Sequence, residues 1–325
     1  MMVGRAAELS ELVEAWSRLG AGTPSGPRTA LLTGAAGCGK SLLVTAALAA
    51  FEPAARIVLA GGARVHSPAP YDWLAAVLSA HDTGDLPVPP DALTWLAQQP
   101  GQTAQRYAPA ALLRLAVKAV RALVGTGPAV IIAEDLHALD PASLNLLAEV
   151  ASAPGLPALL LVTSRPPEEA VSPELAARTL ARLTGTPDAI RVHLGTLGTA
   201  EVGALLEGAY GAPVPGEVVD AVRARTGGNP YALTELLATA RAYGLLDGGE
   251  EANLTARERE VLSCLAAGMS NKQVARSLGI SIRTVAVHVS NLLRKTRSAS
   301  RTEAALWAVR HSGQLIAGSR TVNSV

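Results

Sequence analysis

Residues 34–41 read Gly-Ala-Ala-Gly-Cys-Gly-Lys-Ser, between the apolar run RTALLT at 28–33 and an Ala/Leu-rich segment at 41–51. This is the pattern G-x-x-x-x-G-K-[ST], with an expected strand before it and an expected helix after it. Glycines let backbone N–H groups approach phosphate oxygens without a Cβ in the way. The unpaired N–H groups and the positive dipole end of the helix face the same anion. The stretch therefore predicts a phosphate-binding loop on a strand–loop–helix unit.

Two side chains of this loop have roles of their own in the predicted site. Lys40 reaches the β- and γ-phosphates of a nucleotide, and the hydroxyl of Ser41 is a ligand for Mg²⁺. We expect the ligand to be ATP with Mg²⁺, because this loop pattern is built for a nucleoside triphosphate. The residues expected to hold it from this segment are Gly34, Ala35, Ala36, Gly37, Cys38, Gly39, Lys40, Ser41 and Leu42.

Strands and helices alternate through the first 195 residues. Further apolar runs predict strands at 56–60, 129–133, 158–163 and 189–194. Helices are expected at 71–80, 91–98 and 109–124, and another begins at Asp140-Pro141. This alternation predicts an α/β fold, a parallel sheet with helices on both faces. After residue 195 the strands stop, and helices are expected at 199–210, 216–226 and 230–243.

Two acidic residues, Glu134 and Asp135, directly follow the strand expected at 129–133. Ligands bind beyond the carboxyl ends of parallel strands, so both carboxylates are expected near the phosphate loop. One carboxylate of such a pair can hold Mg²⁺, and the other can orient or deprotonate the attacking water. Of the six histidines we single out only His137, which would help to position this acidic loop.

The next strand ends in Thr163-Ser164-Arg165. This segment could present a hydroxyl and a guanidinium group to the γ-phosphate. The alternative is an ordinary turn before Pro166-Pro167.

Charge is divided unevenly along the chain. Residues 253–325 hold eleven Lys/Arg and three Asp/Glu, a net charge of +8, whereas residues 1–252 carry a net charge of −7. A basic C-terminal segment predicts a nucleic-acid contact there, and a solvated charged surface is the alternative. Only two cysteines occur, far apart, which excludes a disulfide scaffold and indicates a reducing cytoplasm. No apolar stretch reaches about 18 residues, so no membrane partner is expected.

Residues 254–311 predict four short helices. Thr255 and Glu258 form a capping box at the start of the first helix, and Ser270 and Ser281 cap the second and third. Gly279 makes a tight turn between those two helices. A short glycine-containing turn between two helices is the spacing of a helix-turn-helix motif, and a small helical protein-interaction domain is the alternative.

The third of these helices, expected at 281–295, has two faces. At 100° per residue one side carries Ile282, Val285, Val289, Leu292 and Leu293. The opposite side is short, polar and basic, and could enter the major groove of double-stranded DNA. There Val287 would meet a thymine methyl, while other side chains reach base edges or phosphates. The DNA contacts expected on these grounds are Asn271, Lys272, Arg283, Thr284, Val287, Ser290, Asn291, Arg294, Lys295, Arg297 and Thr302.

The order of the N-terminal motifs resembles the signal-transducing STAND branch of AAA-like NTPases. The matching stretches are VGRAAEL at 3–9, the phosphate loop, EDLHALD at 134–140, TSRP at 163–166 and GNP at 228–230. The resemblance implies strand order 5-1-4-3-2 and a helical lid after the sheet. It places Gly4 and Arg5 near the adenine end, and Pro230 in the lid motif that senses nucleotide. It also implies that Glu134 lies on the Mg²⁺ side, that Asp135 activates water, and that Arg165 is a sensor.

The C-terminal segment resembles the LuxR/GerE-type helix-turn-helix. The matching stretches are LTAREREVL at 254–262, AAGMSNKQVARSLGIS at 266–281, SNLLRK at 290–295 and SRTEAA at 300–305. The resemblance implies DNA binding, usually as a homodimer on paired half-sites. It implies base contacts from Ala286, Val287, Ser290 and Asn291, and it has basic residues more often at 286 and 290.

We therefore expect five regions: a P-loop NTPase core at 1–195, a helical lid at 196–245, a linker at 246–253, a LuxR-type helix-turn-helix domain at 254–315 and a tail at 316–325. The expected function is an ATP-binding, nucleotide-switched transcription regulator in the cytoplasm, with RNA polymerase as a candidate partner. A slow ATPase activity would suit such a switch. Two alternatives stay open: an ATPase motor or chaperone-like NTPase with incidental DNA binding, and a DNA-binding protein with a degenerate nucleotide site.

Overall fold

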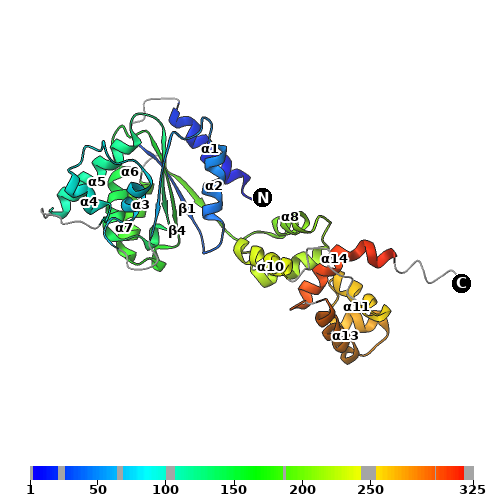
Figure 1. The fold of residues 1–325 in the computed structure, drawn as a ribbon. Helices are drawn as coiled ribbons and strands as arrows, with labels where there is room; N and C mark the ends of the chain where they lie inside the picture. Colours follow the sequence, from blue (N-terminus) through cyan, green and yellow to red (C-terminus); the bar gives the residue numbers. More distant parts are fainter. Residues whose placement is uncertain are drawn as a thin grey trace. The chain divides into compact units, whose positions relative to one another are not determined.

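A computed structural model of the chain describes residues 3–20, 26–63, 69–99, 107–185, 188–242, 254–296 and 298–317 (Figure 1). By contacts between Cα atoms the chain forms two compact units, Gly4–Gly195 and Thr196–Val325. The predicted linker at 246–253 and Arg297 lie outside the described residues.

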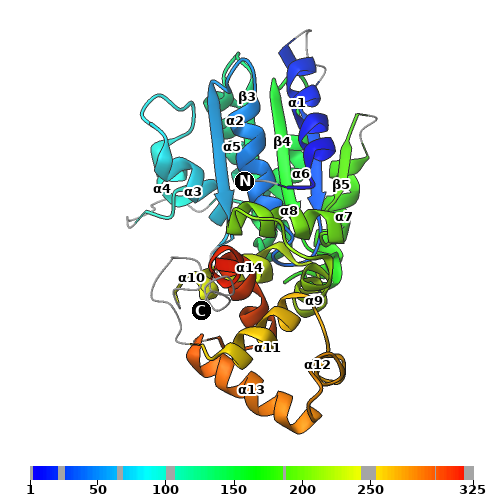
Figure 2. The same ribbon diagram turned by 90° about the vertical axis from the view of Figure 1, so that its right-hand side faces the viewer.

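The first unit is built on a parallel sheet of five strands. The strands are β1 (Arg28–Thr33), β2 (Ile57–Gly62), β3 (Ala129–Glu134), β4 (Ala158–Ser164) and β5 (Ile190–His193). Their order is β2-β3-β4-β1-β5, so the order implied by the resemblance is confirmed (Figure 2). Every residue of the central strand β4 is buried. A strand covered on both faces reads as a continuous apolar run, which is why sequence alone located it.

Helices cover both faces of this sheet (Figure 1). On one face, α1 (Ala6–Gly20) and α2 (Lys40–Ala50) pack against alternate strand residues such as Ala30 and Leu32. On the other face the intervening residues, such as Leu31, meet a larger group of helices. That group is α3 (Asp72–Ala80), α4 (Pro90–Leu96), α5 (Pro109–Val124), α6 (Pro141–Ala151) and α7 (Pro173–Thr184), with short 3₁₀ turns η1 (Leu136–Ala138) and η2 (Pro167–Glu169). The α/β class is confirmed.

Asp140 joins two of the helices on that second face. It caps α6 as predicted, because its buried carboxylate accepts hydrogen bonds from the N–H groups of Ala142 and Ser143 at 2.9 and 3.0 Å. The same carboxylate accepts from the N–H groups of Tyr71 and Asp72, at 3.0 and 3.2 Å, where α3 begins. One side chain thus fixes the starts of both helices.

The second unit is all helical in the part that the structure describes. The helices α8 (Thr199–Tyr210), α9 (Gly216–Thr226) and α10 (Pro230–Ala242) occupy the predicted lid. The helices α11 (Ala256–Ala266), α12 (Asn271–Leu278), α13 (Ile282–Lys295) and α14 (Arg301–Ala317) follow. Side chains from both sets form one hydrophobic cluster. No described helix has the length and apolar character needed to cross a membrane.

The predicted caps of the helix-turn-helix are confirmed. Thr255 and Glu258 form a capping box, with the N–H of Thr255 donating to the Glu258 carboxylate at 2.8 Å. Ser270 and Ser281 accept from backbone N–H groups at the starts of α12 and α13. Gly279 ends α12 in the left-handed conformation, with φ of 64°. The turn therefore has the geometry that its sequence predicts.

Replacing Asp140 by alanine should destabilise the first unit strongly. The change removes the acceptor for four backbone N–H groups and should cost about 3–5 kcal/mol, because buried donors without partners are expensive. Asp140→Asn keeps one acceptor oxygen and should cost less. Urea unfolding measures the difference, with the exposed Asp85→Ala as the matched control. An Asp140→Ala protein as stable as wild type would contradict this role.

Candidate nucleotide site and DNA-binding surface

The phosphate loop leaves β1 at Gly34, and its course requires glycine. Gly34 and Gly39 have φ values of 151° and 96°, in the region that disfavours other residues. A Cβ on Gly34 would lie 2.5 Å from the carbonyl oxygen of Leu194 and 2.7 Å from Sγ of Cys38. The start of the loop is therefore pressed against the end of β5, and Cys38 is buried beneath it.

Lys40 is buried at the first position of α2. Its Nζ donates hydrogen bonds to the carbonyl oxygens of Gly34 and Ala35, at 2.8 and 2.9 Å. Among the described residues, none of the ion pairs involves Lys40. A buried ammonium bonded to neutral carbonyls calls for an anion close by. Together with the open backbone of the loop, it fits a nucleotide phosphate.

The acidic residues lie at the same edge of the sheet. Strand register pairs Thr33 of β1 with Ser164 of β4, and β4 runs beside β3, which ends at Glu134. Parallel strands bring their carboxyl ends to one edge, so the loop, the acids and Arg165 follow three neighbouring strands. The structure thus gathers at this edge the residues that the sequence singled out from three distant segments.

Asp135 adopts an unusual backbone conformation just after β3, with φ of 49° and ψ of 52°. For a residue with a side chain this region costs about 1–2 kcal/mol, and such outliers gather at functional sites. The N–H of Asp135 donates to Oγ1 of Thr163 at 2.9 Å, which holds the residue in place, while its carboxylate stays exposed.

The expectation that a hydroxyl of the Thr163-Ser164-Arg165 segment faces the γ-phosphate is wrong for both hydroxyls. Both side chains are buried and already bonded within the protein. Thr163 accepts from Asp135, and Oγ of Ser164 donates to the carbonyl of Arg165 at 2.7 Å. Sequence reasoning missed Thr163 as a support for the acidic loop, since only the three-dimensional pairing of β3 and β4 reveals it.

His137 connects the acidic loop to the Arg165 segment. It is buried in η1, and its Nδ1 lies 3.3 Å from the N–H of Arg165, which donates to it, and 3.9 Å from Oδ1 of Asp135. Burial lowers the pKa of His137; Asp135 opposes this shift, while the charges of Arg165 and Lys40 add to it. The imidazole is therefore neutral at pH 7 and acts as a hydrogen-bond acceptor. Its contacts agree with the predicted positioning role.

The remaining predicted nucleotide residues lie in three places. The guanidinium group of Arg5 donates to the carbonyl of Gly195 and forms an ion pair with Glu8 at 3.3 Å, so Gly4 and Arg5 lie beside the end of β5. Ser41 and Leu42 are exposed on the first turn of α2. Pro230 begins α10, in the second unit.

No group of three or more His, Cys, Asp and Glu side chains in the described part of the chain is arranged to hold a metal ion. The residues do fit Mg²⁺, which usually binds through one or two protein oxygens together with phosphate oxygens and water. Ser41 and Glu134 would supply those protein oxygens.

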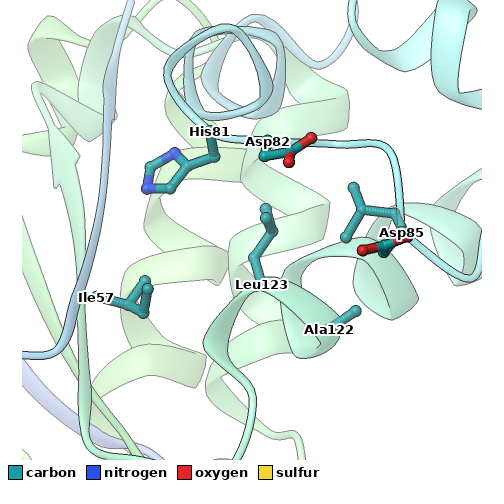
Figure 3. Close-up of a pocket in the computed structure, with 7 residues that line it drawn as sticks. Ile57, His81, Asp82, Asp85, Ala122 and Leu123 are labelled. Carbon is teal, nitrogen blue, oxygen red and sulfur yellow. The ribbon is translucent and has the colours of Figure 1, made fainter.

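A separate cavity of about 350 Å³ lies in the first unit (Figure 3). His81, Asp82 and Asp85 line it from the loop after α3, and Ile57, Leu86, Ala122 and Leu123 complete it. Ile57 is the first residue of β2, so the cavity lies at the amino ends of the strands, away from the phosphate loop. It is not part of the nucleotide site.

The exposed face of α13 carries most of the predicted DNA contacts. Val285 and Leu292 are buried, whereas the exposed residues are Arg283, Thr284, Ala286, Val287, Ser290 and Arg294, with Asn291 half-buried. The expectation that Ile282 belongs to the buried face is wrong, because its side chain is 53% exposed. It is the first residue of α13.

The predicted phosphate contacts around α13 differ in their surroundings. Lys272 is exposed, while Asn271 and Thr302 are half-buried. Oδ1 of Asn271 accepts from Arg301 at 2.6 Å. Lys295 donates to the buried Glu258 at 2.6 Å, so it has a structural partner besides any phosphate.

Two families match the chain. Residues 2–162 match the AAA ATPase domain, and residues 252–308 match the bacterial regulatory proteins of the luxR family. The loop, its acids and the helix-turn-helix each fall within the matching segment. An AAA ATPase domain implies a nucleotide site, and a LuxR-type helix-turn-helix implies DNA binding.

Curated relatives match short segments. The uncharacterized transcriptional regulatory protein YhcZ of Bacillus subtilis is 54% identical over 59 residues, which are 18% of this chain and 28% of that protein. The nitrate/nitrite response regulator NarL of Escherichia coli K12 is 44% identical over 77 residues, which are 23% of this chain and 36% of that protein. The chain therefore spans well under half the length of these two relatives.

Among solved structures, the Aeropyrum pernix ORC1 protein in complex with DNA aligns with a TM-score of 0.48 and 17% identity. The alignment covers 98% of this chain and 95% of that one.

The ion pair of Lys295 and Glu258 should make the stability of the helix-turn-helix depend on pH. Burial raises the pKa of Glu258, but hydrogen bonds from Lys295 and Thr255 outweigh it, so this pKa lies below its ordinary value. A lowered carboxyl pKa stabilises the fold above the unfolded pKa, and the contribution disappears as pH falls through the folded pKa. Glu258→Gln should therefore cost about 1–3 kcal/mol at pH 7 and less at pH 3.

The check is denaturant unfolding of the second unit at both pH values, with the exposed Glu235→Gln of α10 as control. An equal loss at both pH values would mean that the charge of Glu258 contributes nothing.

Proposed function

We propose that this chain, in which an AAA ATPase domain precedes a LuxR-family helix-turn-helix domain, is a transcription regulator whose DNA binding depends on bound ATP or ADP. The observation that carries the proposal is the buried ammonium of Lys40, bonded to loop carbonyls, in the same chain as an exposed face of α13. The first feature suits a phosphate anion and the second suits the major groove.

We propose the following roles for the site residues. Backbone N–H groups from Gly34 to Leu42 and the Nζ of Lys40 would bind the phosphates, with Gly4 and Arg5 toward the adenine end. Ser41 and Glu134 would hold Mg²⁺, which neutralises charge between the phosphate oxygens.

Asp135, held through its backbone N–H by Thr163, would orient the attacking water or take its proton. Arg165 would act as a sensor, and Pro230 would belong to the lid motif that senses the nucleotide. Hydrolysis would be slow, because the bound state carries the signal of a switch.

On the DNA side, the exposed residues of α13 would read base edges, and Lys272 and Arg294 would contact phosphates. We further propose that the protein binds paired half-sites as a homodimer, contacts RNA polymerase and lies in the cytoplasm. An ATPase motor with incidental DNA binding is the other candidate, favoured by the same intact loop.

The switch should disappear when Lys40 is replaced. We expect ATP or ADP to change the affinity of wild type for genomic DNA fragments by about tenfold or more, equal to about 1.4 kcal/mol. Lys40→Ala should bind DNA equally with ATP, with ADP and without nucleotide, because the charge that holds the phosphates is gone. Fluorescence anisotropy measures the affinity, and the exposed Lys118→Ala of α5 is the matched control.

Equal DNA affinity of wild type under all three conditions would refute nucleotide switching. Rapid steady-state hydrolysis without DNA, combined with that result, would favour the motor.

DNA affinity should depend on Arg283 independently of nucleotide. Removing a guanidinium that contacts a base or phosphate costs about 1–3 kcal/mol, so Arg283→Ala should weaken DNA binding by roughly 5- to 150-fold in every nucleotide state. ATP binding, followed with a fluorescent analogue, should not change. The exposed Arg178→Ala of α7 controls for the loss of one positive charge. Unchanged DNA affinity of Arg283→Ala would remove α13 from the interface.

A further inference from the structure

One segment of the last helix of the helix-turn-helix domain is buried on all sides. Six consecutive residues of α14, Ala304–Val309, are each at most 7% exposed. Six residues exceed one full turn of 3.6, so no side of this segment faces solvent. Helices α11 and α13 cover part of it, and α9 of the predicted lid also packs against it. A helix that is apolar all round needs partners on every face.

An ion pair between an exposed arginine and a buried glutamate joins α9 to α14. Oε1 of Glu303 lies 3.4 Å from Nη2 of Arg225, and the Glu303 side chain is only 1% exposed. The same carboxylate accepts from the N–H of Ala299 at 2.7 Å and from Oγ of Ser300 at 3.2 Å. Arg225 also donates to Ser300. A buried carboxylate needs such partners, so separating α9 from α14 would leave Glu303 without its cation.

A second contact joins the start of α9 to the turn between α11 and α12. A Cβ placed on Gly268 would lie 2.3 Å from Cβ of Glu217. The helix-turn-helix domain is thus held at two separate points, while the exposed face of α13 stays uncovered.

From these contacts we infer that α8–α10 and the helix-turn-helix domain act as one rigid body. If the proposed function holds, nucleotide binding moves this body as a whole. The helix-turn-helix domain then stays packed against α9 and is not released from it. The single hydrophobic cluster that spans both sets of helices supports this reading.

The first test is a disulfide between α9 and the turn, in the full-length chain. Cβ atoms in a disulfide lie about 3.5–4.5 Å apart, so Glu217→Cys/Gly268→Cys needs a shift of about 1–2 Å to form one. We expect oxidation to give an intramolecular bond between positions 217 and 268, identified by peptide mass spectrometry. The native cysteines stay, since both are buried. The inference would be overturned if only intermolecular bonds formed, or if no bond formed in a folded protein. Intermolecular bonds would mean that α9 contacts this turn in a second copy of the chain.

A second variant covers the case in which a side chain at Gly268 prevents folding. Arg225→Glu places a carboxylate against the buried Glu303 and should separate α9 from α14. Hydrogen exchange of the peptide containing 304–309 should become about tenfold faster or more. The exposed Arg276→Glu of α12 is the matched control. Unchanged exchange in Arg225→Glu would overturn the inference.

The signalling part is tested on the oxidised disulfide variant. Its DNA affinity should respond to ATP and ADP as strongly as that of the reduced protein, because no undocking is needed. Loss of the response on oxidation alone would show that release is required. If nucleotide does not change the DNA affinity of the reduced protein either, the proposed function fails. The cross-link and the exchange rates still show whether α9 is packed against the helix-turn-helix domain.

Discussion

The close approach of Gly34 to the carbonyl of Leu194 is the constraint on which the first unit depends. It fixes the phosphate loop against the end of β5, and the loop in turn holds the Lys40 ammonium between two carbonyl oxygens. The parallel sheet supplies the other residues of the site, because it brings the carboxyl ends of β3 and β4 to the same edge as the loop. The acidic loop is then supported by Thr163 of β4, and its own neutral His137 accepts a hydrogen bond from the N–H of Arg165. The site therefore depends on this close approach together with the strand order of the sheet.

Most of the fold could be predicted from the sequence, because the central strands β3 and β4 are apolar runs and the starts of α6, α11, α12 and α13 carry side-chain caps. Two helices were not predicted. Helix α7 begins at Ser172-Pro173, the same kind of signal that identified α6 at Asp140-Pro141. Helix α1 places Leu12, Trp16 and Leu19 on its buried side, a helical spacing that was available in the sequence. The sequence patterns that predict α1 and α7 were therefore available, and tertiary contacts do not explain why these two helices were missed.

The errors at the sites have a different origin. Helical periodicity predicts the side of α13 on which Ile282 lies. It does not predict whether another segment covers that residue. Thr163 lies near the carboxyl end of β4, at the expected edge of the sheet, yet its hydroxyl is bonded to the backbone N–H of Asp135, which follows β3. The role of Lys295 is likewise decided by the buried Glu258 on α11. The surroundings of each of these side chains depend on a segment far away in the sequence. A local sequence pattern holds no information about that segment.

The contact of Gly268 with Glu217 bears on how such regulators can be recombined. A helix-turn-helix domain transplanted onto this chain would need glycine where α11 turns into α12, and a carboxylate matching Arg225 at the start of its last helix. A domain that lacked this glycine and this carboxylate could still fold and bind DNA. It would then move independently of α9. Exchange of DNA specificity in this chain is therefore constrained by fit to α9 as well as by the residues of α13.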